Sequence, residues 1–197
     1  MNNFFLKEEK KISNQFLKKG YVIKKIDNIK ALTSIRNLFI QSVKKNLGKN
    51  SSYKNANNLL NYIHKKVEIK KLNSFRLKII NDINKSKNLR ELYYKISKPL
   101  LDIIIGNELS MQLRINLSIQ MPKDDSSLLP IHSDVWSGDS PFEGVIWIPL
   151  VDCYKTKSMY ILPPSKYKKI QRLFLQKQSS SSEQIFKKIK KDLQFIN

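Results

Sequence analysis

A histidine and an aspartate two residues apart are the side chains of this sequence best suited to chemistry. They are His132 and Asp134, and they belong to the stretch LPIHSD at residues 129–134. If this stretch is extended, residues i and i+2 point to the same side and their Cα atoms lie about 6 to 7 Å apart. One imidazole and one carboxylate at this spacing provide two of the three ligands in the two-histidine, one-carboxylate site that binds non-heme Fe(II).

The elements that must position this pair begin with helices. Apolar residues recur at helical spacing through most of the first hundred residues, most clearly between Asn28 and Gly48, with Asp27 or Asn28 as the N-cap. Gly20 stands where the first helix is expected to end, and Pro99 is expected to kink or divide the last one. We therefore expect residues 1–105 to form a mainly helical N-terminal region.

After residue 106 the pattern changes from helical to alternating. Apolar and polar side chains alternate strictly from Met111 to Met121, which predicts a long strand with one packed face and one polar face. That polar face suits either the lining of a barrel or contact with solvent. Apolar runs at 144–154 and 158–164 predict further antiparallel strands, and a capping-box pattern predicts a helix after residue 180.

The order of these elements predicts the fold class. Helices followed by antiparallel strands favour an α+β protein. We expect the helical N-terminal part to pack on a double-stranded β-helix, or jelly roll, at 106–197, which is incomplete at its C-terminus and ends in a helical segment. The two parts are expected to form one continuous domain.

The net charge of the chain is +21, and most of it comes from lysine. Only five of the 37 basic residues are arginines, and Lys, Asn and Ile, which are all abundant, share A/T-rich codons. A biased genome explains such a composition, and arginine, the residue best suited to bidentate phosphate contacts, is scarce. We therefore expect a solvated lysine-rich surface, with nucleic-acid binding as a less favoured alternative.

Three further features bear on the compartment. No uninterrupted apolar run is long enough to span a membrane, and the first residues lack the pattern of a secretory signal. The single cysteine, Cys153, has no partner for an internal disulfide and is expected to be a small buried apolar residue in a strand. These features predict a cytoplasmic protein without a membrane span, and they leave the oligomeric state open.

The residues around the histidine and aspartate also resemble a known family. The run from LSIQMP through LLPIHSDVWSGDSPFEGVIWIPLVDCYKTKSMYILPPSK is similar to the Fe(II)- and 2-oxoglutarate-dependent oxygenases of sporadic carbohydrate clusters, within the phytanoyl-CoA hydroxylase-like superfamily. The resemblance covers residues 106–166. It implies a hydroxylase that uses Fe(II) and 2-oxoglutarate to oxidise a sugar or sugar-derived intermediate in surface-carbohydrate biosynthesis, with His132 and Asp134 as iron ligands.

The resemblance implies roles for five more residues. Gln112, Asn116 and Gln120, on the polar face of the expected strand, would line the cosubstrate or sugar pocket. Trp136 and Trp147 would form a wall of that pocket and contact the substrate. For Trp147, packing in the core is the stronger expectation, because large aromatic side chains are usually buried.

The sequence departs from the family pattern after the aspartate. Such enzymes take a second histidine and an arginine for 2-oxoglutarate from later strands, but no histidine follows Asp134, and the only later arginine, Arg172, lies in a lysine-rich segment. The other histidine, His64, is expected to be partly exposed on a helix rather than a ligand.

We therefore expect the missing ligands to belong to sequence beyond Asn197, and little or no turnover from these 197 residues alone. The alternative is a non-catalytic jelly-roll binding module that has lost the metal.

Overall fold

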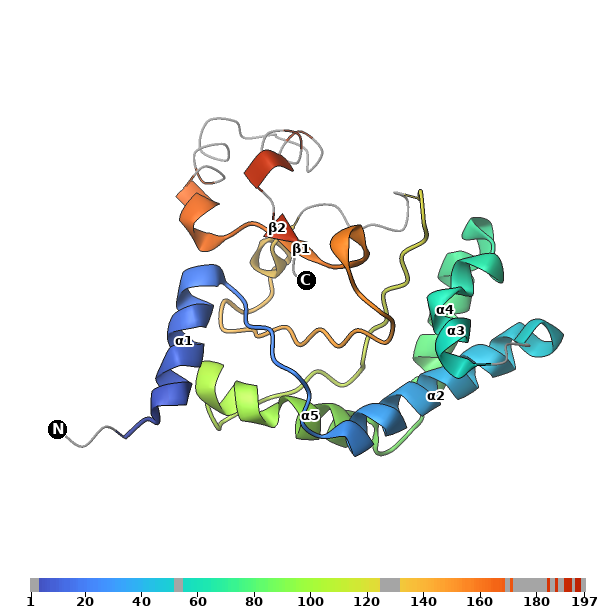
Figure 1. Cartoon of the computed structure of the whole chain (residues 1–197), viewed down its shortest axis with the longest axis horizontal. Coiled ribbons are helices and arrows are strands. Elements are labelled where there is room, and N and C mark those ends of the chain that lie inside the picture. Colours follow the sequence, from blue (N-terminus) through green and yellow to red (C-terminus); the bar gives the residue numbers. More distant parts are fainter. Residues whose placement is uncertain are drawn as a thin grey trace.

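The structure is a computed structural model, and it describes residues 4–51, 55–124 and 132–168, with residues 171, 184, 187, 190–192, 194 and 195 nearer the C-terminus. Helices form its first half, and long irregular segments follow them (Figure 1). The α-helices are α1 (Lys7–Lys19), α2 (Ile29–Leu47), α3 (Ala56–Asn61), α4 (Ile69–Ile83) and α5 (Leu89–Ile104). The mainly helical character expected for the N-terminal region is therefore confirmed.

The ends of the first two helices follow from local chemistry. Gly20 ends α1 in the left-handed conformation, with φ of 79°, and its N–H donates to the carbonyl of Phe16 at 2.7 Å. The side chain of Asn28 caps α2 by accepting from the N–H of Ala31 at 3.0 Å. Both ends lie where the sequence predicts them.

Pro99 lies inside a continuous α5, so of the two expected effects, a kink or a division of the helix, the division was wrong. A proline in a helix leaves the carbonyl four residues earlier without its usual donor. Pro99 and Lys95 are both exposed, so water can hydrate the Lys95 carbonyl. The apolar face of α5 also continues past the proline.

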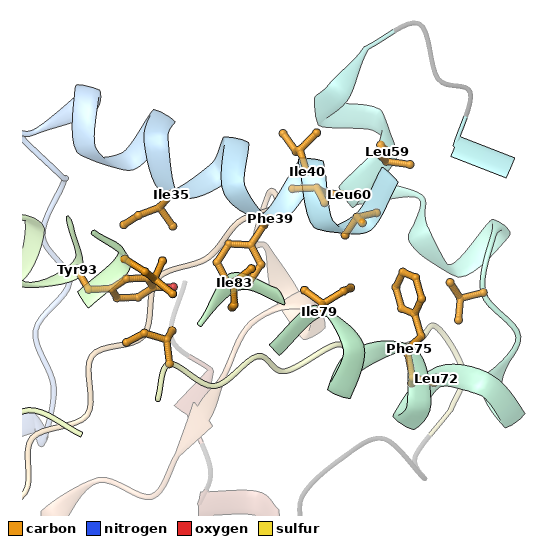
Figure 2. Close-up of a cluster of buried hydrophobic side chains, with 14 of the residues drawn as sticks. Ile35, Phe39, Ile40, Leu59, Leu60, Leu72, Phe75, Ile79, Ile83 and Tyr93 are labelled. Carbon is orange, nitrogen blue, oxygen red and sulfur yellow. The ribbon is translucent and has the colours of Figure 1, made fainter. Parts of the chain in front are cut away.

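The hydrophobic core lies where α2 packs against α4 and α5. The largest fully buried side chains are Phe39, Ile35, Leu59, Ile79 and Leu89. In Figure 2 the Phe39 side chain of α2 points across the core toward Ile83 of α4. Apolar positions at helical spacing on three helices thus bury one another, and the core of the described residues is helical.

Asp82 links α4 to α2 at the edge of this core. Its carboxylate accepts hydrogen bonds from the side chains of Ser42 at 3.2 Å, Lys45 at 3.0 Å and Asn46 at 2.9 Å. These bonds, the one from Lys45 foremost, lower the pKa of Asp82, while partial burial of the side chain acts in the opposite direction. The charged form of Asp82 is therefore the form that the fold stabilises.

The jelly roll expected at 106–197 was wrong. Among the described residues, the strands are β1 (Tyr160–Ile161) and β2 (Gln194–Phe195), which form a two-stranded antiparallel sheet with Tyr160 opposite Phe195. Residues 111–121 and 144–154 form no strand. The helix expected after residue 180 lies mostly outside the described residues.

The alternation in residues 111–121 nevertheless has a structural cause. From Ile115 on, the apolar side chains are packed, since Ile115 and Met121 are buried in the helical core and Leu117 and Ile119 are partly buried. Leu113 departs from the pattern and is 81% exposed. The polar side chains of the segment are exposed: Gln112, Arg114, Asn116, Ser118 and Gln120. An alternating pattern indicates an extended backbone with two different faces, but it does not say what covers the apolar face. Here helices cover it instead of a second sheet.

The side chains of Asn84 and Arg90 make some of the hydrogen bonds to residues 111–115 that a neighbouring strand would otherwise make. The amide of Asn84, just after α4, donates to the Ile115 carbonyl at 2.9 Å and accepts from the Ile115 N–H at 2.8 Å. Arg90 of α5 donates to the carbonyls of Met111 at 2.9 Å and Gln112 at 3.1 Å. These contacts fix the position of residues 111–115 on the helices.

In the part of the chain that the structure describes, no helix combines the length and the apolar character that a bilayer crossing requires.

Candidate metal site

His132 and Asp134 lie side by side, as their spacing predicts. Ser133 between them is extended, with φ of −124° and ψ of 136°, and the distance from His132 Nε2 to Asp134 Oδ1 is 3.5 Å. Both side chains are nearly half exposed, at 47% and 44%. An exposed pair of this kind contributes little to folding stability, because solvent weakens the attraction between the two groups.

The turn after this pair fixes the backbone of Asp134. Asp134–Ser137 form a short 3-10 helix, η3, which ends at Gly138 with φ of 97°, a left-handed conformation that favours glycine. The Asp134 carbonyl accepts from the N–H of Asp139 at 3.2 Å, and the Val135 carbonyl accepts from the N–H of Gly138 at 3.3 Å. The aspartate is therefore the first residue of a closed turn.

The charge around the pair differs from that of the rest of the chain. Residues 124–154, which we call the acidic segment, contain six carboxylates and no lysine or arginine, although the chain as a whole has a net charge of +21. At physiological ionic strength, charges more than about 8 Å apart in solvent are largely screened from one another. The residues next to His132 and Asp134 in the sequence are therefore acidic or neutral.

The donor set fits Fe(II) as two of its ligands. An imidazole nitrogen and a carboxylate oxygen are donors of the type used in non-heme iron sites. Two donors about 2.1 Å from one ion and at right angles lie about 3 Å apart, close to the observed 3.5 Å. Within the described residues, no group of three or more His, Cys, Asp or Glu side chains is placed to hold a metal ion, so this pair alone would offer two donors.

The three residues expected to line the cosubstrate pocket are all exposed. Gln112 lies within the stretch that Asn84 and Arg90 position, and Asn116 and Gln120 follow it along the chain. The hydrogen bonds of this segment described above lead to α4 and α5 rather than to His132. Their contact with a cosubstrate stays a prediction.

The structure describes the side chain of Trp147 but not that of Trp136. Trp147 is 41% exposed, so it is not the core residue that its size suggested. Trp136 belongs to η3, and its side chain lies outside the described residues. A role for either ring in binding substrate stays a prediction.

The other candidate groups occupy separate places. His64 lies in a 3-10 helix, η2 (Ile63–Lys65), is partly exposed and has its ring centroid 6.1 Å from that of Tyr62. Asp152 joins the end of the acidic segment to α3 by accepting from the side-chain amide of Asn61 at 3.1 Å. Arg172 lies outside the described residues.

Cys153 is partly exposed rather than buried in a strand. Partial burial nevertheless raises the pKa of its thiol, so the protonated form is favoured over the reactive thiolate.

Pattern analysis missed Asn84 and Arg90, which position residues 111–115. A helix C-terminus followed by asparagine is a common ending, and an exposed arginine on a helix is ordinary. The sequence therefore holds no local signal that would single out either residue.

Comparisons with protein-family models, with curated proteins and with solved structures gave no match.

Proposed function

We propose that this chain is an Fe(II)- and 2-oxoglutarate-dependent oxygenase of the cytoplasm that acts on a sugar or sugar-derived molecule, with His132 and Asp134 as metal ligands. The observation that supports it most is the 3.5 Å approach of these two side chains within the acidic segment. The resemblance of residues 106–166 supports the cosubstrate and the substrate class. The proposal does not rest on a jelly roll, which the described residues lack.

The residues of the chain have separate tasks in this proposal. The Nε2 atom of His132 and the carboxylate of Asp134 hold the metal, and the turn that ends at Gly138 keeps Asp134 in place. Gln112 and Asn116 offer amide groups that can donate to and accept from sugar hydroxyls or a carboxylate. When bound, Fe(II) with 2-oxoglutarate supplies the oxidising chemistry.

Metal binding is the property that tests the proposal directly. Anaerobic calorimetric titration with Fe(II), in the presence of 2-oxoglutarate, should show one site per chain. His132→Ala and Asp134→Ala each remove one donor and should raise the Kd by about tenfold or more. His64→Ala is the matched control, because it removes a histidine outside the site and should leave the Kd unchanged.

The same experiment separates the proposal from a non-catalytic binding protein. Iron that binds equally well to the wild-type chain and to His132→Ala would exclude this site. A wild-type chain that binds no iron would favour the non-catalytic alternative. We expect little formation of succinate by these 197 residues, because the part of the chain that the structure describes offers only two side chains to the metal in this site.

A further inference from the structure

Two short turns of the chain have the same construction, a tyrosine followed three residues later by a lysine. Tyr62 precedes η2, and Tyr154 precedes the 3-10 helix η4 (Lys155–Lys157). In each turn the tyrosine carbonyl accepts from the lysine N–H at 2.9 Å, from Lys65 in the first and from Lys157 in the second. Because residues i and i+3 are eclipsed in a 3-10 turn, the lysine side chain lies beside the tyrosine ring. The two Nζ atoms are 4.7 Å and 4.9 Å from the ring centroids.

The fold brings these two turns together, although 91 positions separate the residues that join them. The side-chain amide of Asn61 donates to the Asp152 carboxylate at 3.1 Å and accepts from the Asp152 N–H at 3.3 Å. Asn61 directly precedes Tyr62, and Asp152 is two residues before Tyr154. Since consecutive Cα atoms are about 3.8 Å apart, the Cα atom of each tyrosine lies within about 8 Å of the Cα atom of a residue in this contact.

We call Tyr62, Lys65, Tyr154 and Lys157 the tyrosine–lysine surface. All four side chains are exposed, the two tyrosines at 42% and 57%. Among the residues that the structure describes, neither lysine forms an ion pair. The sequence around both turns is basic, since residues 61–71 contain four lysines and one glutamate, and residues 152–168 contain four lysines and one aspartate. The surface therefore combines flat aromatic rings with a net positive charge.

These two properties match the two parts of a nucleotide in a single strand. A tyrosine ring offers a surface on which a base stacks, and a lysine neutralises a neighbouring phosphate. At an exposed site, the attraction of a lysine to an aromatic ring is weaker than the stacking of a base, so a base can take the ring while the flexible lysine moves to a phosphate. We propose that the tyrosine–lysine surface binds single-stranded nucleic acid without preference for sequence.

Other anionic partners fit this surface less well. In a duplex the bases lie inside the stack, so exposed tyrosine rings have no base face to contact. An anionic bilayer would attract the lysines, but proteins that bind there usually insert the apolar face of an amphipathic helix, whereas two 3-10 turns form this surface. The scarcity of arginine is no obstacle, because bidentate arginine contacts serve to read bases, while binding without sequence preference needs only stacking and positive charge.

Fluorescence anisotropy of the full chain with labelled oligonucleotides tests the proposal. Oligouridylate and oligothymidylate of about 12 nucleotides are the RNA and DNA probes, with a length in the range that single-strand sites cover. At an ionic strength of about 0.15 M, at least one of the two should bind with a Kd below about 100 μM. A duplex of the same length is the third probe.

Substitutions in the tyrosine–lysine surface separate stacking from charge. Tyr62→Leu and Tyr154→Leu keep the charge and remove a ring, so each should raise the Kd for the single strand about fivefold or more and leave the Kd for the duplex unchanged. Lys65→Gln and Lys157→Gln should each reduce the slope of log K against log salt concentration by about 0.7 for the single strand, whereas the tyrosine variants should keep the wild-type slope. All four side chains are exposed, and equal urea midpoints would show that the variants are folded.

Tyr94 and Lys98 of α5 provide the matched control. The Lys98 Nζ atom is 5.9 Å from the centroid of the Tyr94 ring, but it also pairs with the Asp102 carboxylate at 2.6 Å, so its charge is already balanced. Tyr94→Leu and Lys98→Gln should therefore leave the Kd and the salt slope for the single strand unchanged. Lys98→Gln changes the net charge of the chain by the same amount as Lys65→Gln.

Four results would overturn the proposal. They are a Kd above about 100 μM for both single-stranded probes, tyrosine variants that bind the strand as wild type does, tyrosine variants that lose affinity for the duplex in the same proportion, and an equal loss of affinity in Tyr94→Leu. Binding to phosphatidylserine vesicles by a chain that binds neither single-stranded probe would assign the surface to a membrane instead.

Discussion

Gly20 has two structural constraints at a single residue. Its φ of 79° lies in the left-handed region, and an added Cβ would meet the Cδ and Cγ atoms of Pro164 at 3.3 Å. We predict that Gly20→Ala lowers the free energy of unfolding by about 1 kcal/mol, because alanine is strained in this conformation. Urea denaturation measures the change, with Lys19→Ala as a control that should stay within about 0.5 kcal/mol of wild type.

Asp82 gives a prediction about pH. Because its pKa is lowered in the folded chain, its contribution to stability is present above the pKa of an unfolded aspartate, about 3.9, and is lost as the pH falls through the lower folded value. Asp82→Asn should therefore have a lower urea midpoint than wild type at pH 7. The difference should become smaller below about pH 4.

A difference in midpoint between wild type and Asp82→Asn that is the same at pH 7 and pH 3 would contradict this account. Asp102→Asn is a suitable control, because Asp102 pairs with Lys98 on an exposed face of one helix rather than linking two helices.

For single residues, the sequence predicts the approach of His132 to Asp134, but it does not predict the surroundings of Trp147. The approach of His132 to Asp134 depends on one extended residue between them, and the i, i+2 rule contains all the information needed. The exposure of Trp147 depends on which distant segments pack around it. Residue spacing does not contain that information.

Among the elements, residues 111–115 depend on Asn84 for their position. We predict that Asn84→Ala lowers the free energy of unfolding by about 1 to 3 kcal/mol, because the Ile115 backbone would lose both the acceptor and the donor that it now contacts. Hydrogen exchange of the Ile115 N–H should become faster by a corresponding factor.

Asn88→Ala is the matched control for this element, because the Asn88 side chain makes no capping hydrogen bond at the start of α5. Equal stability of the two variants would show that the amide of Asn84 does not hold the extended segment.

Elements differ in how far sequence predicts them. Helix α2 has its capping residue, its apolar face and its final glycine within about twenty residues, so its bounds follow from local pattern. Residues 111–121 have an equally clear pattern, but a strand also needs a partner, and the partner is a matter of tertiary structure. The pattern predicted the packed positions from Ile115 to Met121, but it was wrong at Leu113, which is 81% exposed, and wrong about the sheet.

Across the whole molecule, the helical core and the acidic segment differ in how far they bury their apolar side chains. The core buries Phe39 and Ile79 almost completely between helices, while the acidic segment leaves Phe142 and Val145 in solvent. An α+β jelly roll was inferred from the order of patterns along the chain, and that order does not determine whether apolar segments form a sheet or pack on existing helices.

The absence of lysine and arginine from the acidic segment also has a practical consequence. Trypsin cuts only after these residues, so complete digestion releases residues 124–155 as one peptide that contains His132 and Asp134. Both tryptophans of the chain and its one cysteine lie in the same peptide. The intrinsic tryptophan fluorescence of the intact protein therefore reports on this segment alone, and a thiol-reactive label on Cys153 would mark the same region.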